Sequence, residues 1–218
     1  EAHIFSPMIS EKNLKPPFIS LLVSGGHTIL SSITNKSNYK ILGKTLDDSA
    51  GEVFDKVARH LGLPYPGGPE ISNASSKISS SSFKFPRPMI NTDCYDFSFS
   101  GLKTHVTQLI NRTTLTDEII SDISYDFENA ILDVLISKTL KASKDLNIND
   151  IVISGGVSAN KRLRERFEKE KNEKNIYFPD LAFSTDNGAM IAYMGWLKYY
   201  DNNNDSLEIN PKPTSSLA

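Results

Sequence analysis

Aliphatic and β-branched residues gather in short runs that predict strands. One run covers residues 18–24 and another covers 150–154, and each leads into Ser-Gly-Gly. Segments 27–34 and 39–45 carry further runs of this kind, so we expect strands there too, with the first Ser-Gly-Gly as the turn between two of them. The same strand-and-turn combination therefore occurs twice, far apart in the chain.

Other segments carry apolar residues at helical spacing. Val53, Val57 and Leu61 recur every four residues in a predicted helix at 47–63, which begins with Asp-Asp-Ser and stops at a Pro- and Gly-rich stretch. After a serine-rich stretch, an ordered segment is predicted at 96–110. Further helices are predicted at 116–146 (one helix or two), 158–172 and 186–200, and a short strand at 176–179. Strands that alternate with helices predict an α/β fold.

Changes in composition along the chain indicate how it is organised. Residues 17–200 carry the periodic segments and predict one lobe, interrupted at 72–88 by a serine-rich stretch that predicts a surface loop. Residues 1–16 lead into the pair Pro16-Pro17 and are interpreted as a helix remnant and a linker. Residues 201–218 predict a disordered or draped tail.

Composition narrows the classes of function. The 218 residues, 39% hydrophobic and 23% charged, are typical of a globular protein with a buried core. A single cysteine, Cys94, excludes an internal disulfide and favours a reducing compartment. No apolar run approaches the roughly 18 residues that cross a membrane, and no signal peptide is recognisable.

The net charge of −2 argues against a polybasic nucleic-acid binder, so any RNA contact requires a local basic patch. The candidates for such a patch are Lys103, Lys161, Arg162, Arg164 and Arg166. A solvated helix face is the favoured interpretation of the last four, and RNA contact is the alternative.

The Ser-Gly-Gly turns also indicate chemistry. Two glycines after a strand let backbone amides approach a ligand closely, which is how phosphate groups are held. One such turn is a weak signal, because any tight turn can be Gly-Gly. Two of them, each after a buried strand, favour a nucleotide site; His27, which follows the first turn, is interpreted as a packed strand residue.

Five blocks in order resemble one known family: VSGGHT (23–28), DDSAGEVFDKVARHLGLPYPGGP (47–69), FSFSGLKT (97–104), SGGVSANKRLRE (154–165) and STDNGAMIA (184–192). They resemble the tRNA N6-adenosine threonylcarbamoyltransferases, also called universal threonylcarbamoyladenosine synthases and formerly O-sialoglycoprotein endopeptidases, in the bacterial and organellar branch. The resemblance implies an actin/sugar kinase/Hsp70-like (ribonuclease H-like) fold, mainly its carboxy-terminal lobe. The opening EAH is similar to the end of the family's H-x-E-A-H metal motif, so 1–16 resembles a remnant of the amino-terminal lobe.

The resemblance implies a reaction and a set of partners. A threonylcarbamoyl group passes from threonylcarbamoyl-adenylate (threonylcarbamoyl-AMP) to N6 of the adenosine next to the tRNA anticodon, and AMP is released. One Fe2+ or Zn2+ per subunit is implied, together with tRNA, partner subunits of a modification complex or a homodimer, and no membrane. The implied location is the bacterial cytoplasm or the mitochondrial or plastid matrix.

The resemblance also implies roles for individual residues, each beside an ordinary structural alternative. His3 and Asp186 would bind the metal; the alternatives are a solvated histidine and a helix N-cap. Asp55 would accept a ribose hydroxyl, or instead pair with Arg59 four residues on. Asn160 would contact adenine through its amide, or instead start a helix.

The remaining implied substrate contacts come from backbone. They are the turn residues Leu22, Val23, Ser24, Gly25 and Gly26, whose last two amides would hold the adenylate phosphate, and Gly68, whose backbone would lie against the ribose or base.

Three rival functions stay open. A metallopeptidase is disfavoured because no HExxH motif is present. A kinase or ATPase of the same fold would need a second phosphate clip and a catalytic carboxylate that this sequence does not display. A non-catalytic, nucleotide-binding scaffold subunit is the third alternative, against which the retained metal-ligand and Ser-Gly-Gly blocks argue.

Overall fold

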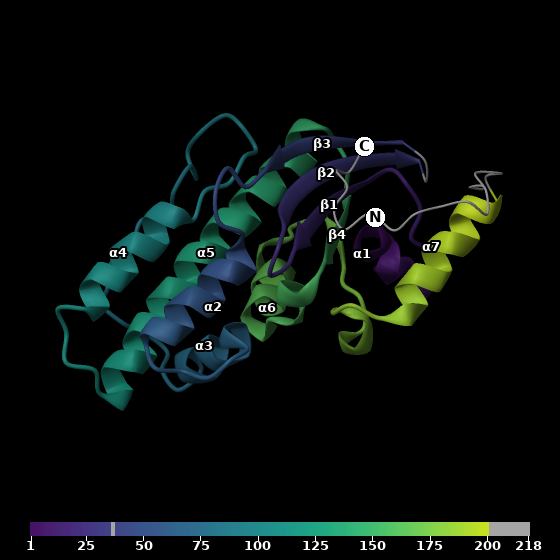
Figure 1. Ribbon diagram of the computed structural model, residues 1–218. Helices are drawn as coiled ribbons and strands as arrows, with labels where there is room; N and C mark the ends of the chain where they lie inside the picture. The colour runs from purple at the N-terminus through teal and green to yellow at the C-terminus, as the bar shows by residue number, and fades with distance from the viewer. Residues whose placement is uncertain (36–37, 201–218) are drawn as a thin grey trace.

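A five-stranded mixed sheet forms the centre of the computed structural model, which describes residues 1–35 and 38–200 (Figure 1). Its strand order is β3-β2-β1-β4-β5, with β1 (Phe18–Val23), β2 (Thr28–Asn35), β3 (Asn38–Lys44), β4 (Asp150–Ser154) and β5 (Asn175–Tyr177). β1, β2 and β3 pair antiparallel, whereas β1, β4 and β5 run parallel. The predicted α/β fold and the predicted strands are confirmed to within a residue or two.

The centre of the sheet is covered on both faces, and alternation along β1 assigns its side chains to them. Ile19, Leu21 and Val23 join the larger hydrophobic cluster, whereas Phe18 and Leu22 join a smaller one on the opposite face. All six residues of β1 are buried. Alternate side chains of a strand point to opposite faces, so a fully apolar run is the pattern of a central strand covered on both sides.

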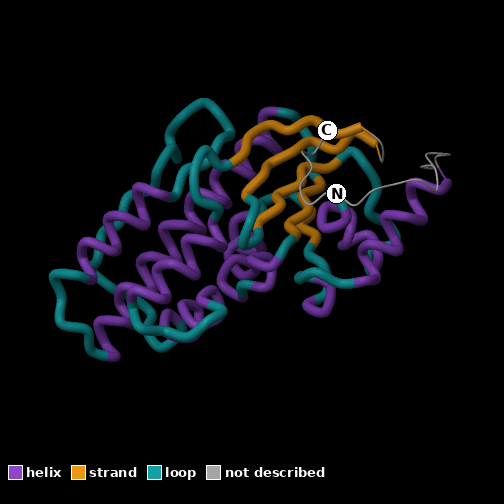
Figure 2. Tube along the Cα trace, viewed as in Figure 1, coloured by secondary structure: helices purple, strands orange, loops and turns teal. Residues whose placement is uncertain are grey.

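Five helices supply the larger cluster: α2 (Ala50–His60), α3 (Gly67–Ser75), α4 (Ser100–Ile110), α5 (Asp117–Asp145) and α6 (Lys161–Glu170). They lie together on one side of the sheet, as Figures 1 and 2 show. The segment 116–146 is one helix, α5, which Thr116 caps by accepting a hydrogen bond from Ile119 N. Its long buried stripe packs against β1, β4 and α3.

Two short turns and a long helix cover the other face: α1 (Ala2–Phe5), the 3-10 turn η1 (Ser6–Ile9) and α7 (Gly188–Tyr200). Ile4 and Phe5 pack with Met194 and Leu197 against Phe18 in the smaller cluster. Residues near the two ends of the described chain therefore lie side by side (Figure 1). The remaining turns are η2 (Gly156–Ala159) and η3 (Leu181–Phe183).

The structure corrects two expectations about the middle of the chain. The serine-rich loop expected at 72–88 begins inside α3, which runs to Ser75. The rest of it is anchored rather than only solvated: Phe85 is buried against His105, and Arg87 forms an ion pair with Asp133 at 2.8 Å. Serines are compatible with a helix when their hydroxyls have partners, and the sequence pattern did not reveal those partners.

Two further features bear on the expected organisation. The tail expected at 201–218 lies outside the described residues. Within 1–35 and 38–200, no helix combines the length and the apolar character needed to cross a membrane.

Candidate nucleotide and metal site

The two Ser-Gly-Gly turns meet at one edge of the sheet. They follow β1 and β4, which are parallel neighbours, so both turns leave the same end of the sheet. A Cβ at Gly155 would lie 2.5 Å from Val23 O, and Gly155 has a φ of +89°. Only glycine meets both requirements, the close approach and the left-handed backbone. Gly155 thus lets the chain after β4 turn directly against the end of β1, where the first Ser-Gly-Gly turn begins.

The first turn is closed by its own serine. Ser24 N donates to His27 O at 2.8 Å, and Ser24 Oγ accepts from Gly26 N at 3.3 Å and His27 N at 3.1 Å. The side chains of Leu22 and Val23 are buried in the core, so neither side chain is available to a ligand. A phosphate at this turn would compete with the Ser24 hydroxyl for the Gly26 amide.

The amino terminus of α2 packs onto this turn. Ser49 caps α2, accepting from Glu52 N, and its hydroxyl donates to Gly25 O at 2.6 Å. Gly51 N donates to Ser24 O at 3.2 Å, and a Cβ on Gly51 would lie 2.5 Å from that oxygen. The positive end of the α2 dipole therefore points toward the turn, which suits an anionic ligand.

Asp55 connects α2 to α3. Its Oδ1 accepts from Gly67 N at 2.8 Å, and Gly67 packs so closely that a Cβ there would lie 2.7 Å from Asp55 Cα. Within the described residues Asp55 forms no ion pair with Arg59, so the pairing alternative is wrong. Gly68, next in the chain, has open space around its Cα. The structure thus brings Asp55 beside the YPGGP segment.

Asn160 caps α6, as the structural alternative predicted. Its Oδ1 accepts from Leu163 N at 2.8 Å, and its Nδ2 donates to Ser72 Oγ at 2.9 Å and to Glu128 Oε1 at 2.7 Å. Ser72 lies on α3, one helical turn after Gly68. The residues expected at the nucleotide site are therefore linked through α2, α3 and the two turns.

His3 and Asp186, 183 residues apart in sequence, lie in direct contact. His3 Nε2 is 3.0 Å from Asp186 Oδ1, and the Asp186 side chain is 94% exposed. Asp186 does not cap α7; Asn187 does, accepting from Met190 N at 2.9 Å. The N-cap alternative for Asp186 is therefore wrong, and its carboxylate remains at the surface, available to a ligand.

This pair supplies two donors of the kind that zinc and iron accept. An imidazole nitrogen and a carboxylate oxygen suit either metal, but a site needs at least three protein ligands. No group of three or more His, Cys, Asp or Glu side chains suited to a metal occurs in the part of the chain that the structure describes. His3 Nδ1 is buried there without a hydrogen-bond partner, although metal-bound histidines normally have one at that atom. Among the described residues, His3 and Asp186 can therefore supply two of the ligands that a metal site needs.

The arginines of α6 do not form a free basic face, so the favoured interpretation of a solvated face is wrong for them. Arg162 pairs with Glu128, and Arg166 with Asp133 and Glu170. Arg164 donates to Ser158 O and Pro179 O. Lys161, whose side chain is 90% exposed, is the solvated member of the run.

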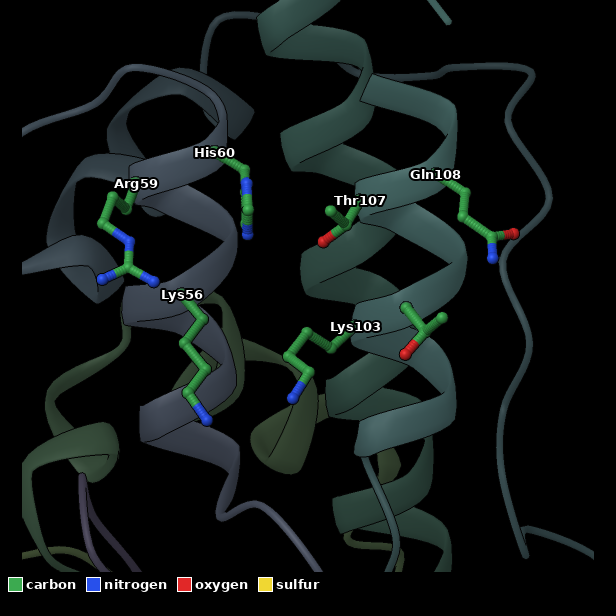
Figure 3. Close-up of a pocket in the computed structure, with 7 residues that line it drawn as sticks. Lys56, Arg59, His60, Lys103, Thr107 and Gln108 are labelled. Atoms are coloured by element: carbon green, nitrogen blue, oxygen red, sulfur yellow. The ribbon is translucent and has the colours of Figure 1, made fainter. Parts of the chain in front are cut away.

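A groove with basic lining runs between α2 and α4. It has a volume of about 330 Å3 and is lined by Lys56, Arg59, His60, Lys103, Thr104, Thr107 and Gln108 (Figure 3). A second hollow of about 310 Å3 shares Lys56 and Arg59 and reaches Asp55. The groove therefore adjoins the candidate nucleotide site.

Asp48, just before α2, limits the positive charge of this groove. Asp48 lies within ion-pair distance of Lys56 (3.0 Å) and of Lys103. Burial opposes ionisation of Asp48, but the hydrogen bonds from Lys103 and Lys56 outweigh it and lower its pKa. Arg59 takes part in none of the ion pairs of the described residues, so it carries the unbalanced positive charge of this groove.

Asp47 holds the segment before α4 in place. It accepts from Phe99 N at 2.8 Å, from Ser100 N at 3.2 Å and from the hydroxyls of Ser98 and Ser100. Burial opposes ionisation, but these hydrogen bonds outweigh it and lower the Asp47 pKa. Asp-Asp-Ser was expected at the amino terminus of α2. Of these three residues, Ser49 alone caps α2.

Sequence reasoning missed three contributors to this region: Gly51, Ser72 and Glu128. A glycine inside an amphipathic helical pattern signals a close approach, and Gly51 carried that signal. Ser72 and Glu128 carried none, because a serine in a serine-rich stretch and a glutamate in a helix are ordinary residues.

The chain resembles known proteins over nearly its whole length. Residues 1–193 match the TsaD family model, described as tRNA N6-adenosine threonylcarbamoyltransferase. Proteins with that name include one from Thermosipho africanus, 48% identical over 199 residues, and one from Buchnera aphidicola subsp. Acyrthosiphon pisum, 46% identical over 220 residues. The alignments cover 90% and 100% of this chain but 60% and 66% of those relatives, so the chain spans less than two-thirds of their length.

Solved structures support the fold. Full-length HypF in its phosphate- and nucleotide-bound form matches with a TM-score of 0.72 at 15% identity, over 93% of this chain and 42% of HypF. The Acidaminococcus fermentans (R)-2-hydroxyglutaryl-CoA dehydratase component A matches at 0.52 and 18% identity, over 89% and 65%. Such identities show the fold alone, and they confirm the expected actin/sugar kinase/Hsp70-like architecture. Because the family model spans residues 1–193, this chain belongs to the tRNA N6-adenosine threonylcarbamoyltransferase family.

Proposed function

We propose that this chain supplies the nucleotide-binding part, and two metal ligands, of an enzyme that transfers a threonylcarbamoyl group from threonylcarbamoyl-adenylate to N6 of the adenosine next to the tRNA anticodon. The observation that carries the proposal is the convergence of both Ser-Gly-Gly turns, Asp55 and Asn160 in a chain of this family. Neither turn alone would specify a nucleotide.

In this proposal the backbone around the turns binds the adenylate. The amides of Gly25 and Gly26 hold the phosphate, and the positive end of the α2 dipole favours its charge. Asp55 accepts a ribose hydroxyl, and the open backbone at Gly68 lies against the ribose or base. Such preorganised donors stabilise the negative charge that develops on the phosphate as it leaves.

The transfer balances without a covalent enzyme intermediate. The N6 amine attacks the carbamoyl carbon, the bond from that carbon to the adenylate phosphate oxygen breaks, AMP leaves with the electron pair, and N6 loses a proton. His3 and Asp186 would hold Fe2+ or Zn2+ together with a further ligand. When bound, such a metal supplies Lewis-acid polarisation of a carbonyl oxygen.

The tRNA would meet the groove between α2 and α4. Phosphate contacts provide most of the affinity for RNA, and Arg59 lines both this groove and the hollow that reaches Asp55. A tRNA strand whose acceptor adenosine lies beside the bound adenylate would bring its flanking phosphates to this groove. Partner subunits or a homodimer, and a cytoplasmic or organellar location, remain part of the same proposal.

A chimaera tests the proposal. The chain replaces the matching segment of the Thermosipho africanus relative, and the chimaera, the native relative and this chain alone are compared. We expect the chimaera to bind AMP, to contain about one zinc or iron per chain and to form the modified nucleoside on tRNA. We expect the chain alone to bind less metal, because two ligands are too few. A folded chimaera that neither binds AMP nor modifies tRNA would overturn the proposal.

A non-catalytic scaffold is the second candidate, and the same comparison separates the two. A scaffold would bind nucleotide in the chimaera without turnover. The contact between His3 and Asp186 favours the enzyme, since a scaffold has no need of a surface imidazole and carboxylate side by side.

A further inference from the structure

A buried carboxylate in the middle of α5 has no role in the function described so far. The Glu128 side chain is 1% exposed and gathers four donors from α3 and from the start of α6. Its partners are Ser72 Oγ at 2.6 Å, Ser75 Oγ, Asn160 Nδ2 at 2.7 Å and Arg162 Nε at 3.0 Å. A buried carboxylate with this many charge-assisted and hydroxyl hydrogen bonds is held in one position.

Glu128 fixes the orientation of the Asn160 amide. Both Nδ2 hydrogens are used, one by Glu128 Oε1 and one by Ser72 Oγ, while Oδ1 accepts from Leu163 N. A flipped amide would set its oxygen against the carboxylate and its NH2 group against the Leu163 N–H. Donor and acceptor chemistry therefore permits one orientation only.

This orientation limits what Asn160 can offer to a ligand. An amide has two donor hydrogens and two acceptor lone pairs on oxygen. With both hydrogens and one lone pair occupied, a single acceptor lone pair on Oδ1 remains, and Asn160 is only partly buried. A purine with an amino group at position 6 donates to such an acceptor, whereas a purine with a carbonyl there opposes it.

We propose that Glu128 is a positioning residue that turns Asn160 into an acceptor-only contact, so that the site selects a 6-aminopurine nucleotide over a 6-oxopurine one. This inference rests on the proposed function, because it assumes that Asn160 faces the base. Beyond the proposed function, it identifies Glu128 as the residue that sets the selectivity, and it states that Asn160 accepts the hydrogen bond from the base. The neighbouring Arg162 balances the charge of Glu128 and also stacks on Tyr125 at 4.3 Å.

The first test uses the unaltered protein. Binding of AMP, IMP and purine riboside 5′-monophosphate, which lacks a group at position 6, is measured by calorimetry on this chain and on the chimaera. We expect AMP to bind about 10-fold more tightly than purine riboside monophosphate, and IMP to bind more weakly still, because sites built around a hydrogen bond reject the analogue that lacks it. Equal binding of AMP and IMP would overturn the inference and leave the proposed function intact. Binding of none of the three would instead count against the proposed function.

The second test exchanges the two groups. Glu128→Gln places an NH2 group where Asn160 needs an acceptor, so we expect the AMP-to-IMP preference to fall to about 3-fold or less. Asn160→Asp places a carboxylate against Glu128, with a similar loss. The double variant sets the new carboxylate at position 160 against the new amide at position 128 and restores the net charge around Arg162, so we expect most of the preference to return.

Glu118→Gln, at an exposed position of the same helix, is the matched control and should behave as the unaltered chain does. A purely structural role for Glu128 makes a different prediction: AMP and IMP binding would fall by the same factor, with no recovery in the double variant. That result would refute the positioning role. If the single variants fail to fold, the nucleotide series on the unaltered protein still decides the selectivity.

Discussion

Gly51 is the residue whose substitution should show most directly how the first Ser-Gly-Gly turn is held. A Cβ at this position of α2 would lie 2.5 Å from Ser24 O and 2.7 Å from Gly25 N, both of which are backbone atoms. Contacts under 3.0 Å are not tolerated, so Gly51→Ala must separate α2 from the turn by about 0.5 Å (3.0 minus 2.5). The turn that we assign to the phosphate would move with it.

The size of the effect follows from two opposing contributions. Overpacking of this kind costs about 1 to 3 kcal/mol, while replacing a helical glycine by alanine gains up to about 1 kcal/mol. We expect a net loss of about 1 kcal/mol in the free energy of unfolding. Gly195→Ala is the matched control, since nothing lies within 4 Å of its added Cβ and it sits on the exposed side of α7. It should gain about 0.5 to 1 kcal/mol.

Thermal unfolding and AMP calorimetry measure the two variants together. A difference of about 2 kcal/mol between them corresponds to about 4 to 8 °C in Tm for a chain of this size. We expect AMP binding to weaken in Gly51→Ala and to stay unchanged in Gly195→Ala. If Gly51→Ala is as stable as Gly195→Ala, or binds AMP as tightly as the unaltered chain does, the close approach of α2 does not hold the turn.

Three further predictions follow from the site. Asp186→Ala should leave Tm unchanged, because the side chain is 94% exposed, and should remove metal from the chimaera; unchanged metal content by mass spectrometry would reject the ligand assignment. Asp47→Ala should lower the free energy of unfolding by about 1 kcal/mol through the lost cap before α4. Because folding lowers the Asp47 pKa, this difference should persist above the unfolded pKa of about 3.9 and disappear as the pH falls through the folded value; a difference that stays constant down to a pH of about 2 would contradict this account. Arg59→Ala should weaken tRNA binding and reduce its salt slope by about 1, whereas Arg112→Ala, at an exposed position beyond α4, should not; equal effects would remove the groove from the RNA-binding surface.

The local elements of this protein were predictable from its sequence. Strand runs, the helix start at Asn160 and both Ser-Gly-Gly turns were readable because backbone sterics and hydrogen bonding within a few residues determine them. Five motif blocks then indicated the fold and the family, and the structural and family matches confirmed both.

Long-range partners decided the rest. Asp47 accepts hydrogen bonds from the start of α4 rather than from α2, and Asp55 accepts from Gly67 N rather than pairing with Arg59. Glu128 accepts hydrogen bonds from two other helices. None of these choices is encoded by spacing, because a carboxylate bonds to whichever donors the packed core brings within about 3 Å. The sequence determined by itself which residues form strands, helices and turns. Only the tertiary structure, by burying the polar groups that cannot remain unpaired, decided which of them act together.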